Sequence, residues 1–158
     1  MFFVTLILII STGLLFYYLQ AVCHNVLRRQ FRQDFFRSIA HTNRLEFPSV
    51  REAIKDSGSP LEYTRLKVNL KCDFLALTYL LKNAANLKQR YSFEELLLIL
   101  YFKLVYASLV MRHQLKMRET PPVLELTAIL EYFANVVGER VYSVRFENLT
   151  APDFLLDV

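Results

Sequence analysis

The sequence predicts an all-α protein, in which an N-terminal transmembrane helix is followed by a small cytoplasmic antiparallel helical bundle and a short extended C-terminal tail. Three observations support this fold class. The first 23 of the 158 residues carry no charge and are mostly apolar. Later segments repeat apolar residues at helical spacing behind helix-starting motifs. The last segment alternates apolar and polar residues, which is typical of a strand.

Residues 1–22 are predicted to be a transmembrane anchor. As a helix, the apolar run from Phe2 to Val22 would span about 30 Å, the thickness of the hydrocarbon core of a bilayer. Tyr17 and Tyr18 lie near one end, where aromatic rings favour the membrane interface. The alternative is a cleaved signal peptide. It is disfavoured because no basic residue precedes the run and no small-residue cleavage site follows it.

Basic residues set the expected orientation. None precedes the span, whereas Arg28, Arg29, Arg32 and Arg37 follow it closely. Positive flanks stay on the cytoplasmic side. The N-terminus is therefore predicted to lie outside and the C-terminus in the cytoplasm, in a bacterial inner membrane or an organellar equivalent. The same four arginines are predicted to contact anionic lipid headgroups, although a role in topology alone would also explain them.

Residues 23–46 are predicted to continue the first helix beyond the membrane as a basic juxtamembrane helix. No glycine or proline interrupts residues 14–47. Apolar residues recur every four positions, with one further phenylalanine beside them: Leu27, Phe31, Phe35, Ile39 and Phe36. Topology alone does not require such a stripe. We therefore expect Phe31, Phe35 and Phe36 to bind a partner.

Residues 47–140 are predicted to form the helical bundle. Its first helix runs from Phe47 to Ser57, with a proline in its first turn and a glycine after its end. A capping box at Ser59–Glu62 then starts a second helix, which runs to about Lys88.

Two further helices complete the bundle. A second capping box at Ser92–Glu95 starts a helix that reaches about Arg118. Thr120 is predicted to cap the last helix, with Pro121 at its first position, and Gly138 is predicted to end it.

The stretch from Leu96 to Met111 is apolar on nearly all sides, which predicts a helix at the centre of the bundle. A second membrane span or a re-entrant segment is one alternative. The stretch is short for a span, and Lys103 would lie near the middle of the membrane. Burial in a larger membrane complex is the other alternative.

Residues 141–158 are predicted to be an extended acidic tail. Tyr142, Val144 and Phe146 alternate with polar residues, as on a half-buried strand. One strand cannot form a sheet by itself. We therefore expect these three residues to bind a partner by adding to the edge of its sheet. A loop folded back over the chain's own bundle is the alternative.

Candidate chemistry is sparse. Three scattered glycines exclude a glycine-rich phosphate loop. The cysteines and histidines show no metal-ligand spacing: Cys23, Cys72, His24, His41 and His113. We therefore expect no catalytic residue, no metal and no cofactor. His24, beside the membrane, could still ligate a haem or chlorophyll metal. Asp73 and Lys103, charges in otherwise apolar helices, are expected to face solvent or to pair with each other.

The expected function follows from the surfaces rather than from a site. The pI is about 9.1, but residues 119–158 hold seven acidic and two basic side chains, so neither nucleic acid nor a small-molecule substrate is expected. Thirteen phenylalanines and nine tyrosines exceed what a small core needs. We expect a non-catalytic single-pass accessory or scaffold subunit of a larger membrane protein complex, with other membrane subunits as its partners. The alternative is a membrane-tethered adaptor or regulator that recruits a soluble cytoplasmic partner. A redox or pigment subunit that uses His24 is a third possibility.

Overall fold

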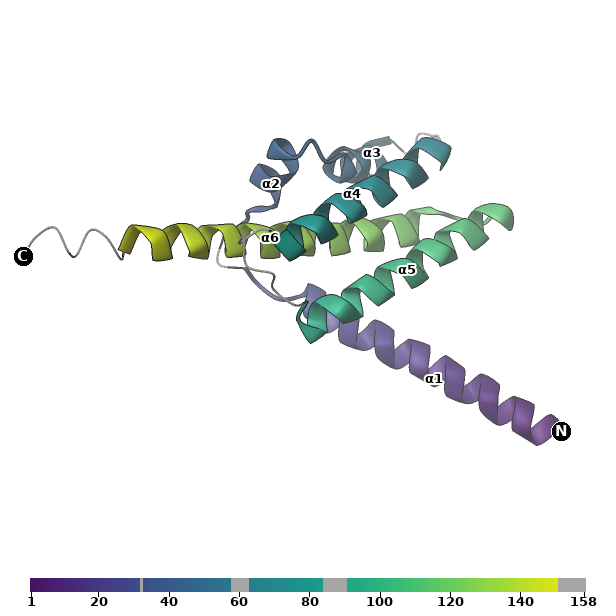
Figure 1. The fold of residues 1–158 in the computed structure, drawn as a ribbon. Helices are drawn as coiled ribbons and strands as arrows, with labels where there is room; N and C mark the ends of the chain where they lie inside the picture. The colour runs from purple at the N-terminus through teal and green to yellow at the C-terminus, as the bar shows by residue number, and fades with distance from the viewer. Residues whose placement is uncertain (32, 58–62, 84–90, 151–158) are drawn as a thin grey trace, which may run out of the picture.

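The computed structural model describes residues 1–31, 33–57, 63–83 and 91–150. This part of the chain is all-helical, as the sequence predicts, and holds six helices and no strand. Figure 1 shows their arrangement. Their bounds are α1 (Phe2–Leu27), α2 (Phe36–Thr42), α3 (Phe47–Ser57), α4 (Tyr63–Asn83), α5 (Phe93–Gln114) and α6 (Thr120–Thr150).

Helix α6 is the centre of the structure, because it contacts each of the other five helices. Figure 1 shows α4, α5 and α6 running in alternating directions. Every residue from Tyr132 to Val137 is buried. The prediction of a central helix at residues 96–111 is therefore wrong in its placement. α5 buries one face through Leu98, while Leu100 and Met111 are about half exposed.

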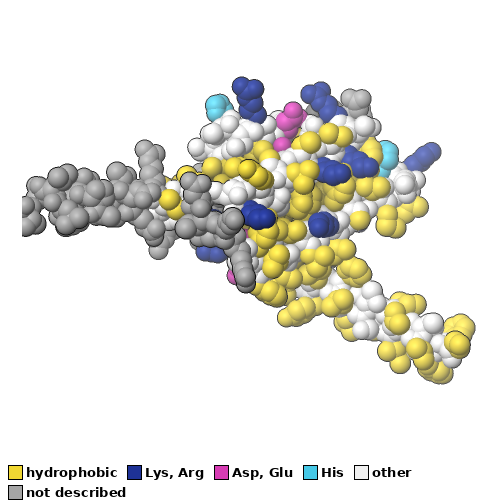
Figure 2. All heavy atoms as spheres, viewed as in Figure 1, with side chains coloured by type: hydrophobic (Ala, Val, Ile, Leu, Met, Phe, Trp, Pro, Cys, Tyr) yellow, Lys and Arg dark blue, Asp and Glu magenta, His cyan; other side chains and the backbone are white. Residues whose placement is uncertain are grey.

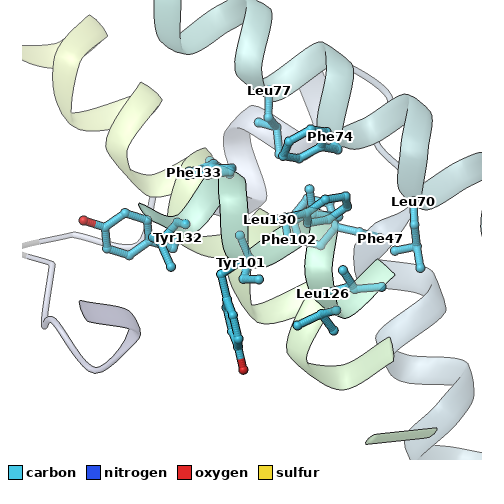
Figure 3. Packing of buried hydrophobic residues seen from close by; sticks show 14 of the residues in the cluster. Phe47, Leu70, Phe74, Leu77, Tyr101, Phe102, Leu126, Leu130, Tyr132 and Phe133 are labelled. Atoms are coloured by element: carbon cyan, nitrogen blue, oxygen red, sulfur yellow. The ribbon is translucent and has the colours of Figure 1, made fainter. Parts of the chain in front are cut away.

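An aromatic and aliphatic core joins α4 and α5 to α6 (Figure 3). The ring of Phe74 on α4 stacks on that of Phe102 on α5, with 3.9 Å between the ring centroids. Phe133 of α6 is fully buried beside them. Phe47, the first residue of α3, is 1% exposed and closes the core from that side. The helix predicted over residues 47–57 is thus confirmed, and burial of its first residue fixes where it starts.

Helix α1 projects away from the remaining helices for most of its length (Figures 1 and 2). It is the one helix in the described ranges that is long and apolar enough to cross a membrane. All side chains from Met1 to Tyr18 are exposed, and Phe2 and Phe3 are more than 80% exposed. Its last two turns pack against α5 and α6 instead, with Cys23 fully buried.

The prediction of one continuous helix from the membrane through residue 46 is wrong. α1 ends at Leu27, and α2 begins only at Phe36. The break lets the chain turn back onto α6, where the ring of Phe31 meets that of Tyr132 edge-on at 5.3 Å between centroids. The four-residue spacing of the stripe therefore reflects packing by two separate segments against one central helix.

The prediction of an extended tail is also wrong for residues 141–150, because α6 continues through Thr150. Gly138 does not end this helix. A Cβ atom built at Gly138 would lie 2.2 Å from the Cβ atom of Phe35 and 2.6 Å from its Cγ atom. The glycine therefore leaves room for Phe35, whose ring also packs 5.6 Å from that of Tyr142, one turn further along α6. Residues 151–158 lie outside the described part of the chain.

Replacing Gly138 by alanine is expected to destabilise the fold. Alanine usually favours a helix by about 1 kcal/mol over glycine. Here the new methyl group overlaps Phe35 near the backbone, where rotation of the ring cannot relieve the clash. We expect Gly138→Ala to lower the free energy of unfolding by about 1–3 kcal/mol, measured by circular dichroism in mild detergent.

Gly13→Ala is the matched control, because nothing lies within 4 Å of the position of its new methyl group. It should leave the free energy of unfolding unchanged or slightly raised, because alanine favours a helix over glycine. If Gly138→Ala is as stable as Gly13→Ala, Phe35 does not pack against α6 as described.

Candidate functional site

Buried polar side chains are candidates for a functional site, because burial and charge together mark many catalytic sites. Within the described ranges, four such residues are buried: Asp73, Glu95, Thr127 and Asn135. Three of them, Asp73, Glu95 and Asn135, accept hydrogen bonds from backbone N–H groups at the start of a helix.

Glu95 lies at the start of α5 and confirms the predicted capping box. The hydroxyl of Ser92 accepts a hydrogen bond from the backbone N–H of Glu95 at 3.3 Å. The Glu95 carboxylate accepts one from the N–H of Ser92 at 3.1 Å. The other carboxylate oxygen pairs with the guanidinium of Arg140, whose side chain is 19% exposed. Arg140 also donates to the carbonyl of Leu81 at 2.7 Å. This group therefore ties the end of α4, the start of α5 and the middle of α6 together.

Asp73 of α4 caps the start of α3. One carboxylate oxygen accepts hydrogen bonds from the N–H groups of Glu46 and Phe47, at 2.9 and 2.7 Å. Burial raises the pKa of Asp73 from 3.8; these two hydrogen bonds oppose the shift, and the charge of Glu46 adds to it. Both sequence interpretations of Asp73 are wrong. Its side chain is buried rather than solvent-facing, and Lys103 is exposed on α5 rather than paired with it.

Asn135 and Thr127 complete the set on α6. The side-chain oxygen of Asn135 accepts a hydrogen bond from the N–H of Phe36 at 2.8 Å, which caps α2 from another helix. Thr127 donates to the carbonyl of Leu124 in its own helix at 2.9 Å. The four buried polar side chains thus have partners that explain them as parts of the scaffold.

The phenylalanines predicted to bind a partner pack against other residues of this chain. Phe31 and Phe36 are partly buried against the core, and Phe35 packs over Gly138. Tyr142 meets Phe35 and is 45% exposed, and Val144 is half-buried. Partner binding by an added strand is excluded for Tyr142 and Val144 in this conformation, since both lie in a helix. Phe146 lies in the same helix, but its side chain is outside the described part.

The arginines predicted to contact lipid headgroups lie around the break between α1 and α2. Arg28 is exposed. Arg29 is half exposed, lies 3.7 Å from a carboxylate oxygen of Glu94, and has its guanidinium 5.8 Å from the ring of Phe31. Arg37 is exposed over the ring of Phe36. Arg32 lies outside the described residues. Headgroup contact remains a prediction for all four.

The histidine and cysteine side chains considered for metal binding do not form a cluster in the described residues. His24 is exposed on α1, and Cys23 is buried with its Sγ atom 4.0 Å from the carbonyl of Leu97. Across the described ranges, no group of three or more histidine, cysteine, aspartate or glutamate side chains is placed to hold a metal ion.

The candidate interface that sequence reasoning missed lies on α4. Its outward face exposes Val68, Leu75 and Tyr79 by 54%, 56% and 68%. With other exposed residues they form a seam at alternating spacings of three and four: Arg65, Val68, Cys72, Leu75, Tyr79 and Lys82. We call these six residues the α4 seam. Figure 2 shows apolar and basic side chains together over α4. The spacing could be found in the sequence, but a stronger apolar face on the same helix obscures it.

No protein-family model, curated protein or solved structure matches this chain.

Substitutions at Asp73 should separate its acceptor oxygen from its charge. Asp73→Asn keeps an oxygen for both N–H groups, whereas Asp73→Ala leaves them unpaired. We expect Asp73→Ala to lower the free energy of unfolding by about 1–3 kcal/mol, and Asp73→Asn to lower it much less. Thermal and chemical unfolding in detergent measure the difference. Equal losses would show that the charge, rather than the acceptor oxygen, holds α3.

The raised pKa of Asp73 makes the free energy of unfolding depend on pH. Because the pKa of Asp73 is raised in the folded state, the protonated form favours folding. That contribution is complete below the unfolded pKa near 3.8 and is lost as the pH rises through the folded value. The stability of the wild-type protein relative to Asp73→Asn should therefore fall as the pH rises above about 4. An increase over this range would contradict the assignment.

Proposed function

We propose that this chain is a non-catalytic, single-pass accessory or scaffold subunit of a larger membrane protein complex. The α4 seam is the observation that carries the proposal. A helix that packs on α6 through one face presents a second apolar face to its surroundings, with the repeat that another helix can match.

The exposed part of α1 supports a membrane anchor. Side chains such as Phe2 and Ile7 are exposed along a helix of 26 residues, long enough for the hydrocarbon core. A cleaved signal peptide fits less well, because Leu19 and Cys23 pack with the remaining helices and cleavage there would open the core. The basic residues after α1 favour an outside N-terminus and a cytoplasmic C-terminus.

The charges of the α4 seam define the chemistry of its partner. Arg65 and Lys82 lie at its two ends, and Lys71 is exposed beside it. An amphipathic helix with acidic flanks would match both the apolar stripe and these charges. Figure 1 shows α4 and α1 on different sides of α6. A partner helix can therefore reach the seam while α1 remains in the membrane.

The same position supports the alternative, a tethered adaptor that recruits a soluble cytoplasmic partner. The two functions differ in where the partner resides. In the first, the helix on the α4 seam belongs to another membrane protein. In the second, it belongs to a soluble one.

Charged substitutions in the α4 seam should dissociate the complex without unfolding the chain. We expect the 18.6 kDa protein to migrate in a much larger species when native membranes are solubilised in mild detergent. Leu75→Glu with Tyr79→Glu should shift it to the size of the free chain, because two charges would be buried in the interface. Native gels and mass spectrometry measure the size and identify the partner.

Lys103→Glu on the exposed face of α5 is the control and should leave the large species intact. A free chain in wild-type membranes would contradict the proposal. So would the same large species formed by the purified chain alone, since the seam would then join two copies. A soluble protein in the complex would favour the adaptor.

A further inference from the structure

The turn between α5 and α6 combines exposed apolar and basic side chains. Met111, Leu115 and Met117 are 61%, 66% and 54% exposed. The basic residues interleaved with them are Arg112, Lys116 and Arg118. We call residues 111–118 the hairpin tip. Leucine beside lysine and arginine is typical of segments that lie in a membrane interface.

The backbone fixes how the hairpin tip presents these side chains. Lys116 has φ +53°, in the left-handed region that favours glycine. Its N–H donates to the carbonyl of His113, and the N–H of Met117 donates to that of Arg112. These two bonds end α5 in the manner of a Schellman motif. The turn is thus ordered by its own hydrogen bonds, with Leu115 and Met117 on either side of Lys116.

A groove places the hairpin tip beside the candidate membrane helix. The groove has a volume of about 590 Å³ and lies between α1 and the ends of α5 and α6. Phe16 and Leu19 line it from α1, and Met111 and Leu115 line it from the hairpin tip. The tip is therefore level with residues 16–20 of α1.

That level coincides with the expected membrane boundary. A transmembrane helix needs about 20 residues, so a span that starts at Phe2 ends near residue 21. Tyr17 and Tyr18 are 73% and 70% exposed at this level, where tyrosine rings favour the interface. A bilayer around α1 therefore meets the hairpin tip at its headgroups.

We propose that the hairpin tip is a second membrane-contact site, which inserts Leu115 and Met117 at the headgroup and acyl boundary of an anionic leaflet. This inference rests on the proposed anchoring by α1. The tip would hold the helices against the membrane and so fix the direction in which α4 faces.

The neighbouring charges agree with an anionic surface. The acidic group closest in sequence, Glu119, is paired with His113 at 2.6 Å. Glu125, which lines the groove, accepts a hydrogen bond from the hydroxyl of Tyr101 at 2.9 Å. Across the described residues, no ion pair engages Lys116 or Arg118. Both cations remain available to lipid phosphates.

Tryptophan fluorescence tests the inference, because the chain has no native tryptophan. Leu115→Trp in the full chain is reconstituted into vesicles of phosphatidylcholine and phosphatidylglycerol, with bromine placed near the headgroup end of the acyl chains. We expect a blue-shifted emission and strong quenching. Tyr79→Trp on the α4 seam, which is equally exposed, should emit as in water and stay unquenched.

Leu8→Trp separates failure of the inference from failure of the anchor. If bromine near the ends of the acyl chains quenches Leu8→Trp but no brominated lipid quenches Leu115→Trp, α1 spans the membrane and the tip proposal is wrong. If Leu8→Trp is not quenched either, the anchor itself is wrong.

A double variant that removes two positive charges tests the preference for anionic lipid. Lys116→Gln with Arg118→Gln, made in the Leu115→Trp chain, should reduce quenching in vesicles with phosphatidylglycerol to the value in phosphatidylcholine alone. Equal quenching of both chains in both vesicles would overturn the role of the two cations. A water-like emission of Leu115→Trp that shifts to the blue only in native membranes would assign the tip to a protein partner instead.

Discussion

The arrangement depends most on the guanidinium of Arg140, which satisfies two helix ends from the middle of a third. It pairs with the Glu95 carboxylate, 2.5 Å away, and donates to the last turn of α4 through the carbonyl of Leu81. A buried carboxylate without such a partner would be costly, since a single unpaired charge inside a protein costs several kcal/mol. Glu95 therefore serves two purposes, capping α5 and holding α6 in place.

The same device recurs across the fold and links it to the proposed function. Asp73 caps α3 from α4, and Asn135 caps α2 from α6. Both of these buried polar side chains join a short helix to a longer one. The scaffold then offers two surfaces of its own, the α4 seam and the hairpin tip. We propose that the first binds a partner helix and the second contacts a membrane.

Local signals were sufficient to predict the all-helical class, the apolar first helix, the bounds of α3 and the capping box at Ser92. Local signals failed where the role of a residue depends on a contact with residues far away in the sequence. Gly138 resembles a helix end, but its missing side chain makes room for Phe35, a contact between residues far apart in the chain. The role of Asp73 could not be predicted from local sequence for the same reason. Its partners at residues 46 and 47 become neighbours only after folding. The α4 seam was readable in principle, since Val68, Leu75 and Tyr79 follow heptad spacing.

A double-mutant cycle on Arg140 and Glu95 tests the central claim most directly. Unfolding in detergent is measured for Arg140→Gln, Glu95→Gln and the double variant. Arg140→Gln should lower the free energy of unfolding by about 3–5 kcal/mol, because it leaves Glu95 buried and unpaired. The double variant should recover much of that loss, since a glutamine at residue 95 keeps the cap without a charge. A loss below about 0.5 kcal/mol for Arg140→Gln, or losses that simply add in the double variant, would show that the helices are held together by the apolar core alone.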